Sequence, residues 1–340
     1  MGRYVVYDCD VGNDDAWGLM MLIKAEAVYQ NRSELADSPA KFEIIGITCV
    51  QGNTSVDQTL INTLRVLKAA SRNDLAIYKG CSSPIMKNEW KNPENFHGQD
   101  GFGNVEHEKP VDLNLVREKH AVIAMYDFVC KHPKRVDFLL VGPLTNFATC
   151  INMYGSAFLD KIGKIYIMGG NYRGKGNITK SAEFNFMMDP EAAHIVLASV
   201  PTPVTLLPWE TCIDGDFDIT LDFRLNVLGT IKSDFIELMN LVERAIFIPK
   251  GLERWLVCDA VLVAAYLFPH LTVKQSQLYH ATVELAGTHT RGQMVIDHLR
   301  QEKENAKIIM EVNGEGYKKI IAWTAGLKGV YMECELEKDL

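Results

Sequence analysis

Apolar and polar residues alternate in blocks along this chain, and the blocks predict a repeated order of strand and helix. Short apolar runs with the length of buried strands lie at residues 5–8, 44–50, 138–141 and 165–168. Each run precedes a longer stretch with helical spacing of apolar positions, at residues 14–29, 56–70, 144–153 and 190–198. This alternation is typical of a parallel sheet covered by helices.

The remaining residues extend this pattern without dividing the chain. Residues 233–263 are predicted to be helical on both sides of Pro249-Lys250-Gly251, and strands are predicted at residues 281–285 and 307–312. Residues 81–112 lack periodicity and predict a long loop, which we expect to be mobile and to act as a lid. With no repeat or linker, we expect one α/β domain over residues 1–340, with a central, mostly parallel sheet and a Rossmann-like core.

Charge and composition narrow the class of partner. The net charge of -8, without a cluster of Lys and Arg, argues against binding to nucleic acid or to an anionic membrane. No apolar run reaches the length of a membrane helix, and the N-terminus lacks the layout of a signal peptide. The eight cysteines form no C-x-x-C pair, which favours reduced thiols and a cytoplasmic location. We therefore expect a small-molecule partner.

Four carboxylates follow the first predicted strand within eight residues: Asp8, Asp10, Asp14 and Asp15. Ligands of α/β sheets gather at the carboxyl ends of strands. Carboxylates this close repel one another unless a cation is bound, and oxygen ligands without a Cys–His cluster favour calcium or magnesium. The alternative is that Asp14 and Asp15 only cap the next helix.

A D-x-D pair after a first strand is also found in haloacid-dehalogenase-type phosphatases. In that interpretation Asp8 is the nucleophile and Asp10 the acid/base of a magnesium-dependent reaction. Gly12 stands where these enzymes have Thr or Val, and Asn13-Asp14-Asp15 does not belong to their pattern. The phosphatase is therefore kept as an alternative only.

Six short motifs occur in order along nearly the whole chain. They are D-C-D-V-G-N-D-D-A from Asp8, the segment 47–53 ending in Gly52-Asn53, H-G-Q-D-G from His97, G-P-L-T-N from Gly142, I-M-G-G from Ile167, and A-E-F-N with D-P-E-A-A from Ala182 to Ala193. In these motifs the chain resembles the inosine–uridine type nucleoside hydrolases.

This resemblance implies calcium-dependent hydrolysis of the N-glycosidic bond of ribonucleosides to ribose and free base. The positions that match calcium ligands are Asp10, Asp15, the Val141 carbonyl and Asp259, and Asp10 also matches the base that activates water. The positions that match the substrate pocket are Asp14, Asn53, Met168, Asn177, Glu183, Phe184, Asn185 and His97. Asp8 matches a support of the metal loop. The resemblance also implies nucleoside salvage and a homodimer or homotetramer.

Physical chemistry supports these roles, although each residue also has a structural interpretation. Cleavage builds positive charge on the ribose, so an anionic pocket stabilises the transition state more than the substrate. Taken singly, Asn53 and Asn177 suit turns, and Met168 suits a core. Glu183 and Asn185 fit a half-buried strand.

Cys258 is the departure from the family pattern, because many relatives carry His immediately before the late calcium-binding Asp. A thiol is mostly protonated at pH 7 but is a weak donor, and Cys258 equally suits a buried helix face. Activation of the leaving base stays open between Cys258, His97 and aromatic stacking by Trp255 or a neighbour. As substrates we expect a mild preference for purine nucleosides such as inosine. A catalytically weak nucleoside-binding protein is the alternative from a different class.

Overall fold

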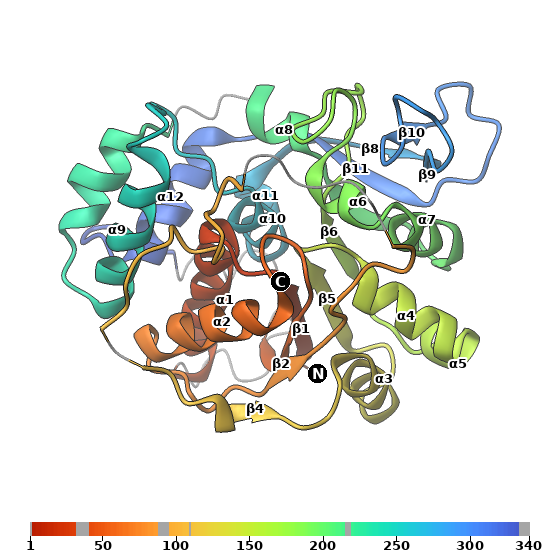
Figure 1. Cartoon of the computed structure of the whole chain (residues 1–340). Helices are drawn as coiled ribbons and strands as arrows, with labels where there is room; N and C mark the ends of the chain where they lie inside the picture. The colour runs from red at the N-terminus through yellow and green to blue at the C-terminus, as the bar shows by residue number, and fades with distance from the viewer. Residues whose placement is uncertain (1, 32–40, 88–94, 109, 215–218, 333–340) are drawn as a thin grey trace.

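A nine-stranded sheet forms the centre of the molecule in the computed structural model, which describes residues 2–31, 41–87, 95–108, 110–214 and 219–332 (Figure 1). The strand order is β4-β3-β2-β1-β5-β6-β7-β11-β8, and every neighbouring pair is parallel except β11 and β8. The strands are β1 (Arg3–Cys9), β2 (Phe42–Cys49), β3 (Ile77–Lys79), β4 (Val116–Arg117), β5 (Val136–Leu140), β6 (Ile165–Met168), β7 (Val204–Leu207), β8 (Val273–Tyr279) and β11 (Ala306–Val312). The predicted α/β domain with a mostly parallel sheet is confirmed.

Helices cover both faces of this sheet. They are α1 (Asn13–Asn31), α2 (Val56–Ala69), α3 (Ala121–Lys131), α4 (Thr145–Tyr154), α5 (Ser156–Leu159), α6 (Phe184–Met188), α7 (Pro190–Ser199), α8 (Trp209–Asp214), α9 (Asp234–Phe247), α10 (Cys258–Leu267), α11 (Pro269–Thr272) and α12 (Gly314–Ala325). Short helical turns η2 (Leu113–Leu115), η3 (Phe223–Val227) and η4 (Leu228–Thr230) and a hairpin of β9 (Ala281–Val283) and β10 (Met294–Ile296) complete the described elements.

Two hydrophobic cores form because the central strands are buried on both faces. In β1, Val5 and Tyr7 pack into the core formed with α1, α2, α10 and α12, while Val6 packs into the core formed with α3, α4 and α7. Successive strand residues point to opposite faces, so an uninterrupted apolar run supplies both cores. This explains why the predicted strands are continuous apolar runs.

Several sequence predictions need correction at the level of single elements. The strand alternative for residues 183–185 is wrong, because Glu183 is the N-cap of α6. Residues 233–263 are helical on both sides of Pro249-Lys250-Gly251, as predicted, but the second helix, α10, begins only at Cys258. The predicted lid at residues 81–112 includes residues 88–94 and 109, which lie outside the described residues. Its described parts contain no helix or strand, and its mobility stays a prediction.

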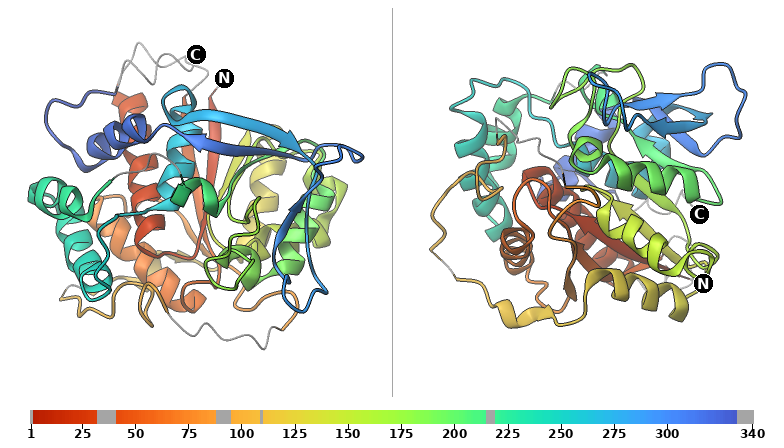
Figure 2. Two further views of the ribbon diagram at one scale, coloured as in Figure 1. Left: turned by 90° about the horizontal axis from the view of Figure 1, so that it is seen from above. Right: turned by 45° about the vertical axis from the view of Figure 1, so that its right-hand side comes forward.

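The parallel strands bring distant segments to one edge of the sheet. The chain leaves β1 toward Asp10, β2 toward Asn53, β5 at Val141 and β7 toward Trp209, and all four strands run in the same direction. The two views of Figure 2 show helices on both faces of the sheet and the long pair of strands β8 and β11 at its far end. Within the described ranges, no helix combines the length and apolar character needed to cross a membrane.

Candidate active site

The loop between β1 and α1 is closed by one of its own carboxylates. Asp15 Oδ1 accepts the Asp10 N–H at 3.1 Å, and Oδ2 accepts the Gly12 N–H at 2.8 Å. A Cβ on Gly12 would lie 2.8 Å from the His97 ring, so a larger residue here would displace that ring. The loop therefore holds the start of α1 close to the segment that carries His97.

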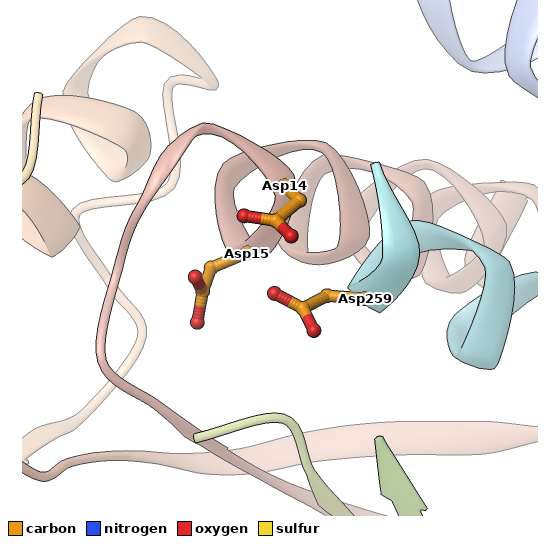
Figure 3. A group of neighbouring side chains, drawn as sticks. All are labelled: Asp14, Asp15 and Asp259. Atoms are coloured by element: carbon orange, nitrogen blue, oxygen red, sulfur yellow. The ribbon is translucent and has the colours of Figure 1, made fainter. Parts of the chain in front are cut away.

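Three carboxylates from two helices, those of Asp14, Asp15 and Asp259, face one another at this edge of the sheet. We call these three side chains the carboxylate group. Asp14 and Asp15 start α1 and Asp259 starts α10, and one oxygen from each lies within 4.8 Å of the others (Figure 3). Burial, followed by the charges of neighbouring carboxylates, raises the pKa of Asp15 and of Asp259 well above the ordinary value. Asp14 Oδ1 is buried and has no hydrogen-bond partner. Oxygen donors in this arrangement fit a hard divalent cation, which would relieve the repulsion.

Asp10 lies beside this group and is 1% exposed. Its Oδ2 accepts the backbone N–H of Asn53 at 2.7 Å. Burial raises the pKa of Asp10 to about 8, against the lowering effect of that N–H. A Cβ on Gly52 would lie 2.0 Å from Asp10 Oδ2, so the G-N sequence lets the second loop approach the carboxylate.

Asp8 belongs to β1 and is buried beneath this site. It is 0% exposed, and its Oδ1 accepts hydrogen bonds from Thr48 Oγ1 at 2.6 Å and Asn146 Nδ2 at 2.8 Å. Burial raises its pKa to about 7. Asp8 is not among the residues that line the cavity described below, so it is poorly placed to attack a phosphate ester. This arrangement disfavours the phosphatase alternative.

A cavity of about 730 Å³ collects most of the sequence-predicted side chains. Asp15 lies in the adjoining carboxylate group, and Asp8 and Trp255 are outside the lining. The predicted residues that line the cavity are Asp10, Asp14, Asn53, His97, Val141, Met168, Asn177, Glu183, Phe184, Asn185, Cys258 and Asp259. The roles of these residues stay predictions, but the fold brings together positions separated by up to about 250 residues of chain.

The cavity also has lining residues that the sequence motifs did not indicate. They are Phe96, Ile178, Trp209, Phe247, Gly251, Leu252, Glu253, Arg254 and Leu256. The rings of Phe96 and Phe247 meet edge to face with centroids 5.8 Å apart. Of these residues, the sequence could have indicated only Phe96 and Ile178, because they adjoin the predicted residues His97 and Asn177. Trp255 is 1% exposed, packs against Trp17 and is not among the lining residues, so the stacking role considered for it is wrong.

Glu183 organises the loops after β6. Its Oε1 accepts the Asn185 N–H at 2.8 Å, and its Oε2 accepts the Gly170 N–H at 2.8 Å. Burial nevertheless raises its pKa to about 7. Asn185 Nδ2 in turn donates to the carbonyl oxygens of Val141 at 2.9 Å and Met168 at 3.2 Å. These contacts join the ends of β5 and β6 to α6.

Glu210 organises the neighbouring loop. Its carboxylate accepts the backbone N–H groups of Tyr172 and Arg173, each at 2.8 Å, and of Lys175 at 3.1 Å. The adjacent residue Trp209 lines the cavity, and the held loop leads directly to Asn177. Glu210 therefore holds the backbone of residues 172–175 next to the start of α8.

Cys258 and His97 differ in their surroundings. The Cys258 thiol is 5% exposed, and its pKa is raised well above the ordinary value, first by the adjacent Cys212 thiol and then by burial. Burial lowers the pKa of His97, whose Nε2 lies 3.9 Å from Asp14 Oδ1. His97 Nδ1 has no hydrogen-bond partner. The imidazole therefore has a free ring nitrogen, whereas the thiol is a very weak acid.

Comparisons with known proteins identify the family of this chain. The model of the inosine-uridine preferring nucleoside hydrolase family matches residues 5–319. A pyrimidine-specific ribonucleoside hydrolase, RihB of Escherichia coli, is 33% identical over 303 residues, which cover 87% of this chain and 88% of that protein. The chain belongs to the inosine-uridine preferring nucleoside hydrolase family. It is an enzyme that acts on the N-glycosyl bond of ribonucleosides.

Solved structures show the same fold. An inosine-guanosine nucleoside hydrolase superposes with a TM-score of 0.82 at 27% identity, covering 95% of this chain and 98% of that one. A purine-preferring ribonucleoside hydrolase from Gardnerella vaginalis superposes with a TM-score of 0.81 at 22% identity, covering 99% and 100%. These relatives thus include both pyrimidine-specific and purine-preferring enzymes.

Proposed function

We propose that this chain hydrolyses purine ribonucleosides, such as inosine, to ribose and free base in a calcium-dependent reaction. The observation that carries the proposal is a single cavity lined both by the carboxylates of Asp10, Asp14 and Asp259 and by the rings of four Phe and Trp residues. The first set suits a ribose and a cation, and the second suits a stacked base.

The acidic lining supplies the chemistry that the reaction needs. Asp10 takes a proton from the attacking water, while Asp14, Asn53, Asn177, Glu183 and Asn185 hold the ribose hydroxyls. Carboxylates near the sugar favour the positive charge that develops as the bond breaks. Bound calcium, held by Asp10, Asp15, Asp259 and the Val141 carbonyl, would orient the ribose diol and lower the pKa of a water. Amide groups add donors that carboxylates lack.

The aromatic lining supports the purine preference. Trp209, Phe96 and Phe247 line the cavity, and a bicyclic base has more ring surface to bury against them than a pyrimidine has. We expect kcat/KM for inosine to exceed that for uridine by about tenfold or more, the equivalent of ~1.4 kcal/mol of additional base contact.

The test measures ribose released from inosine, adenosine, guanosine, uridine and cytidine, with and without a calcium chelator. Calcium-dependent release led by the purine nucleosides supports the proposal. Release led by uridine or cytidine contradicts the purine preference alone. Tight binding without release identifies the catalytically weak nucleoside-binding protein, and turnover of phosphate esters instead identifies the phosphatase. The expected homodimer or homotetramer and the cytoplasmic location stay predictions.

We also propose that His97, rather than Cys258, activates the leaving base. The raised pKa of Cys258 makes its thiol a poor proton donor, whereas His97 lines the cavity and the lowered pKa of its imidazole makes the protonated ring a stronger acid than the thiol. Cys258→Ser should change kcat for inosine by less than about threefold, while His97→Asn should lower it by about 10²-fold, as loss of a general acid does.

A substrate with a good leaving group separates this role from simple binding. With p-nitrophenyl riboside, whose phenolate departs without protonation, His97→Asn should retain most of its activity. An equal loss on both substrates would assign His97 to binding or folding. A large loss in Cys258→Ser on inosine alone would transfer the acid role to Cys258.

A further inference from the structure

A fully buried carboxylate outside the cavity connects three helical segments of the site. Glu243 of α9 is 0% exposed, and its Oε1 accepts hydrogen bonds from Trp255 Nε1 at 2.8 Å, Trp17 Nε1 at 3.1 Å and Asn13 Nδ2 at 3.1 Å. Its Oε2 lies 2.5 Å from Arg224 Nε, and Arg224 is also 0% exposed. We call these five residues the Glu243 cluster.

The two buried charges of the cluster, on Glu243 and Arg224, pair with each other. The Arg224 guanidinium lies over the rings of Trp17 and Trp255, at 5.1 and 5.6 Å from their centroids. A buried carboxylate costs free energy unless it is paired and hydrogen-bonded. Glu243 Oε1 accepts three hydrogen bonds and Oε2 faces Arg224, but neither Oε2 nor the Nε and Nη2 atoms of Arg224 has a hydrogen-bond partner. A buried ion pair of this kind commonly gives no more stability than apolar residues of the same volume. A contribution to stability therefore does not explain why this ion pair is buried here.

The partners of Glu243 occupy informative positions in the chain. Asn13 immediately precedes Asp14 and Asp15, and Trp255 lies four residues before Asp259. Glu243 also precedes Phe247, a cavity-lining residue, by one turn of α9. No member of the cluster is among the residues that line the cavity. Glu243 thus contacts both segments that carry Asp14, Asp15 and Asp259. It also belongs to the helix that forms one wall of the cavity.

We infer that Glu243 is a positioning residue that sets the distance between Asp14 and Asp15 on α1 and Asp259 on α10. This inference rests on the proposed function, because it assigns the carboxylate group to cation binding. Carboxylates that repel one another do not hold a fixed separation by themselves. The hydrogen bonds from Asn13 and Trp255 to a common oxygen hold the two segments in place before any cation arrives.

Asn13→Ala is the sharpest variant, since it removes the hydrogen bond from the residue next to Asp14 and leaves the hydrogen bonds from Trp17 and Trp255 in place. Calcium affinity, measured by calorimetric titration of the chelated protein, should fall about 10- to 100-fold, the usual effect of losing a residue that orients metal ligands. The kcat for inosine should fall with it. Asn240→Ala is the matched control, because Asn240 Oδ1 accepts from Arg224 Nη1 at 2.9 Å and makes no hydrogen bond to Glu243 or to the segments that carry Asp14, Asp15 and Asp259 among the described contacts. It should keep affinity within about twofold.

A second readout does not depend on turnover. The indole N–H signals of Trp17 and Trp255 in nitrogen-15 NMR spectra should shift when calcium is added to the wild type, because both groups donate to Glu243. Glu243→Gln should lower calcium affinity at least as much as Asn13→Ala. If the unpaired Arg224 prevents this variant from folding, Asn13→Ala decides the question.

The outcomes separate this inference from the proposed function. A wild type that neither binds calcium nor releases ribose contradicts the proposed function. A functional wild type whose calcium affinity is the same in Asn13→Ala as in Asn240→Ala, with indole signals that calcium leaves unchanged, overturns the role assigned to Glu243.

Discussion

Asp10→Asn should lower kcat for inosine by about 10³-fold, within the range found when a general base is removed. Asparagine has the same shape and keeps an oxygen that can accept the Asn53 N–H, which Asp10 Oδ2 accepts at 2.7 Å. It has no basic oxygen that can take a proton from water, and it contributes no negative charge to the site. The loss should therefore be chemical rather than structural.

Stability measurements distinguish these two causes. Burial raises the pKa of Asp10 to about 8, so the ionised side chain is unfavourable in the calcium-free fold. The chelated Asp10→Asn protein should unfold at the same temperature as the chelated wild type or above it. Asp57→Asn, at an exposed carboxylate that pairs with Lys79, should keep full activity. An active Asp10→Asn enzyme, or an inactive one with a collapsed unfolding temperature, would contradict the assignment of Asp10 as base.

Removal of calcium should abolish ribose release and destabilise the fold, increasingly so as the pH rises. Burial raises the pKa of Asp10 to about 8 and that of Asp15 and Asp259 well above the ordinary value. In the unfolded chain these groups ionise near their ordinary pKa of about 4. Between these limits the calcium-free folded state binds more protons than the unfolded state. Its free energy of unfolding therefore falls as the pH rises from about 4 to about 8.

Calcium should reverse this trend, because its ligands must be deprotonated and its affinity increases with pH. At a calcium concentration 100 times the dissociation constant, binding adds about 2.7 kcal/mol to the free energy of unfolding. Calorimetric melting of the chelated and the calcium-loaded protein at several pH values measures both slopes. Asp10→Asn should flatten the slope of the chelated protein. A chelated protein that keeps its activity, or whose stability rises with pH over this range, would count against the cation site.

Adding back different ions identifies the natural one. The oxygen-only carboxylate group favours calcium over zinc, and its buried setting disfavours magnesium, which retains several waters. Calcium should therefore restore both ribose release and the unfolding temperature to the chelated protein. Restoration by zinc alone would exclude calcium as the resident ion.

The sequence indicated the order of strands and helices and the carboxylates of the site. The apolar runs of β1, β2, β5 and β6 are long enough and apolar enough to show as buried strands, because local composition reports burial on both faces. The residues after them were expected at one edge because parallel strands end together. Weak strands escaped this reasoning: β3 and β4 have 3 and 2 residues, too few to show a period.

By itself, then, the sequence determined the strand and helix order, the family and the carboxylates that follow β1, since each is written in a short contiguous pattern. Only the tertiary structure decided that Trp209 and Phe247, rather than Trp255, line the cavity, and that Asp8 lies beneath it. It also decided that Glu243 joins α1, α9 and the segment before α10. These contacts join residues up to 230 positions apart, and local patterns carry no information about such pairings because packing selects them only in the complete fold.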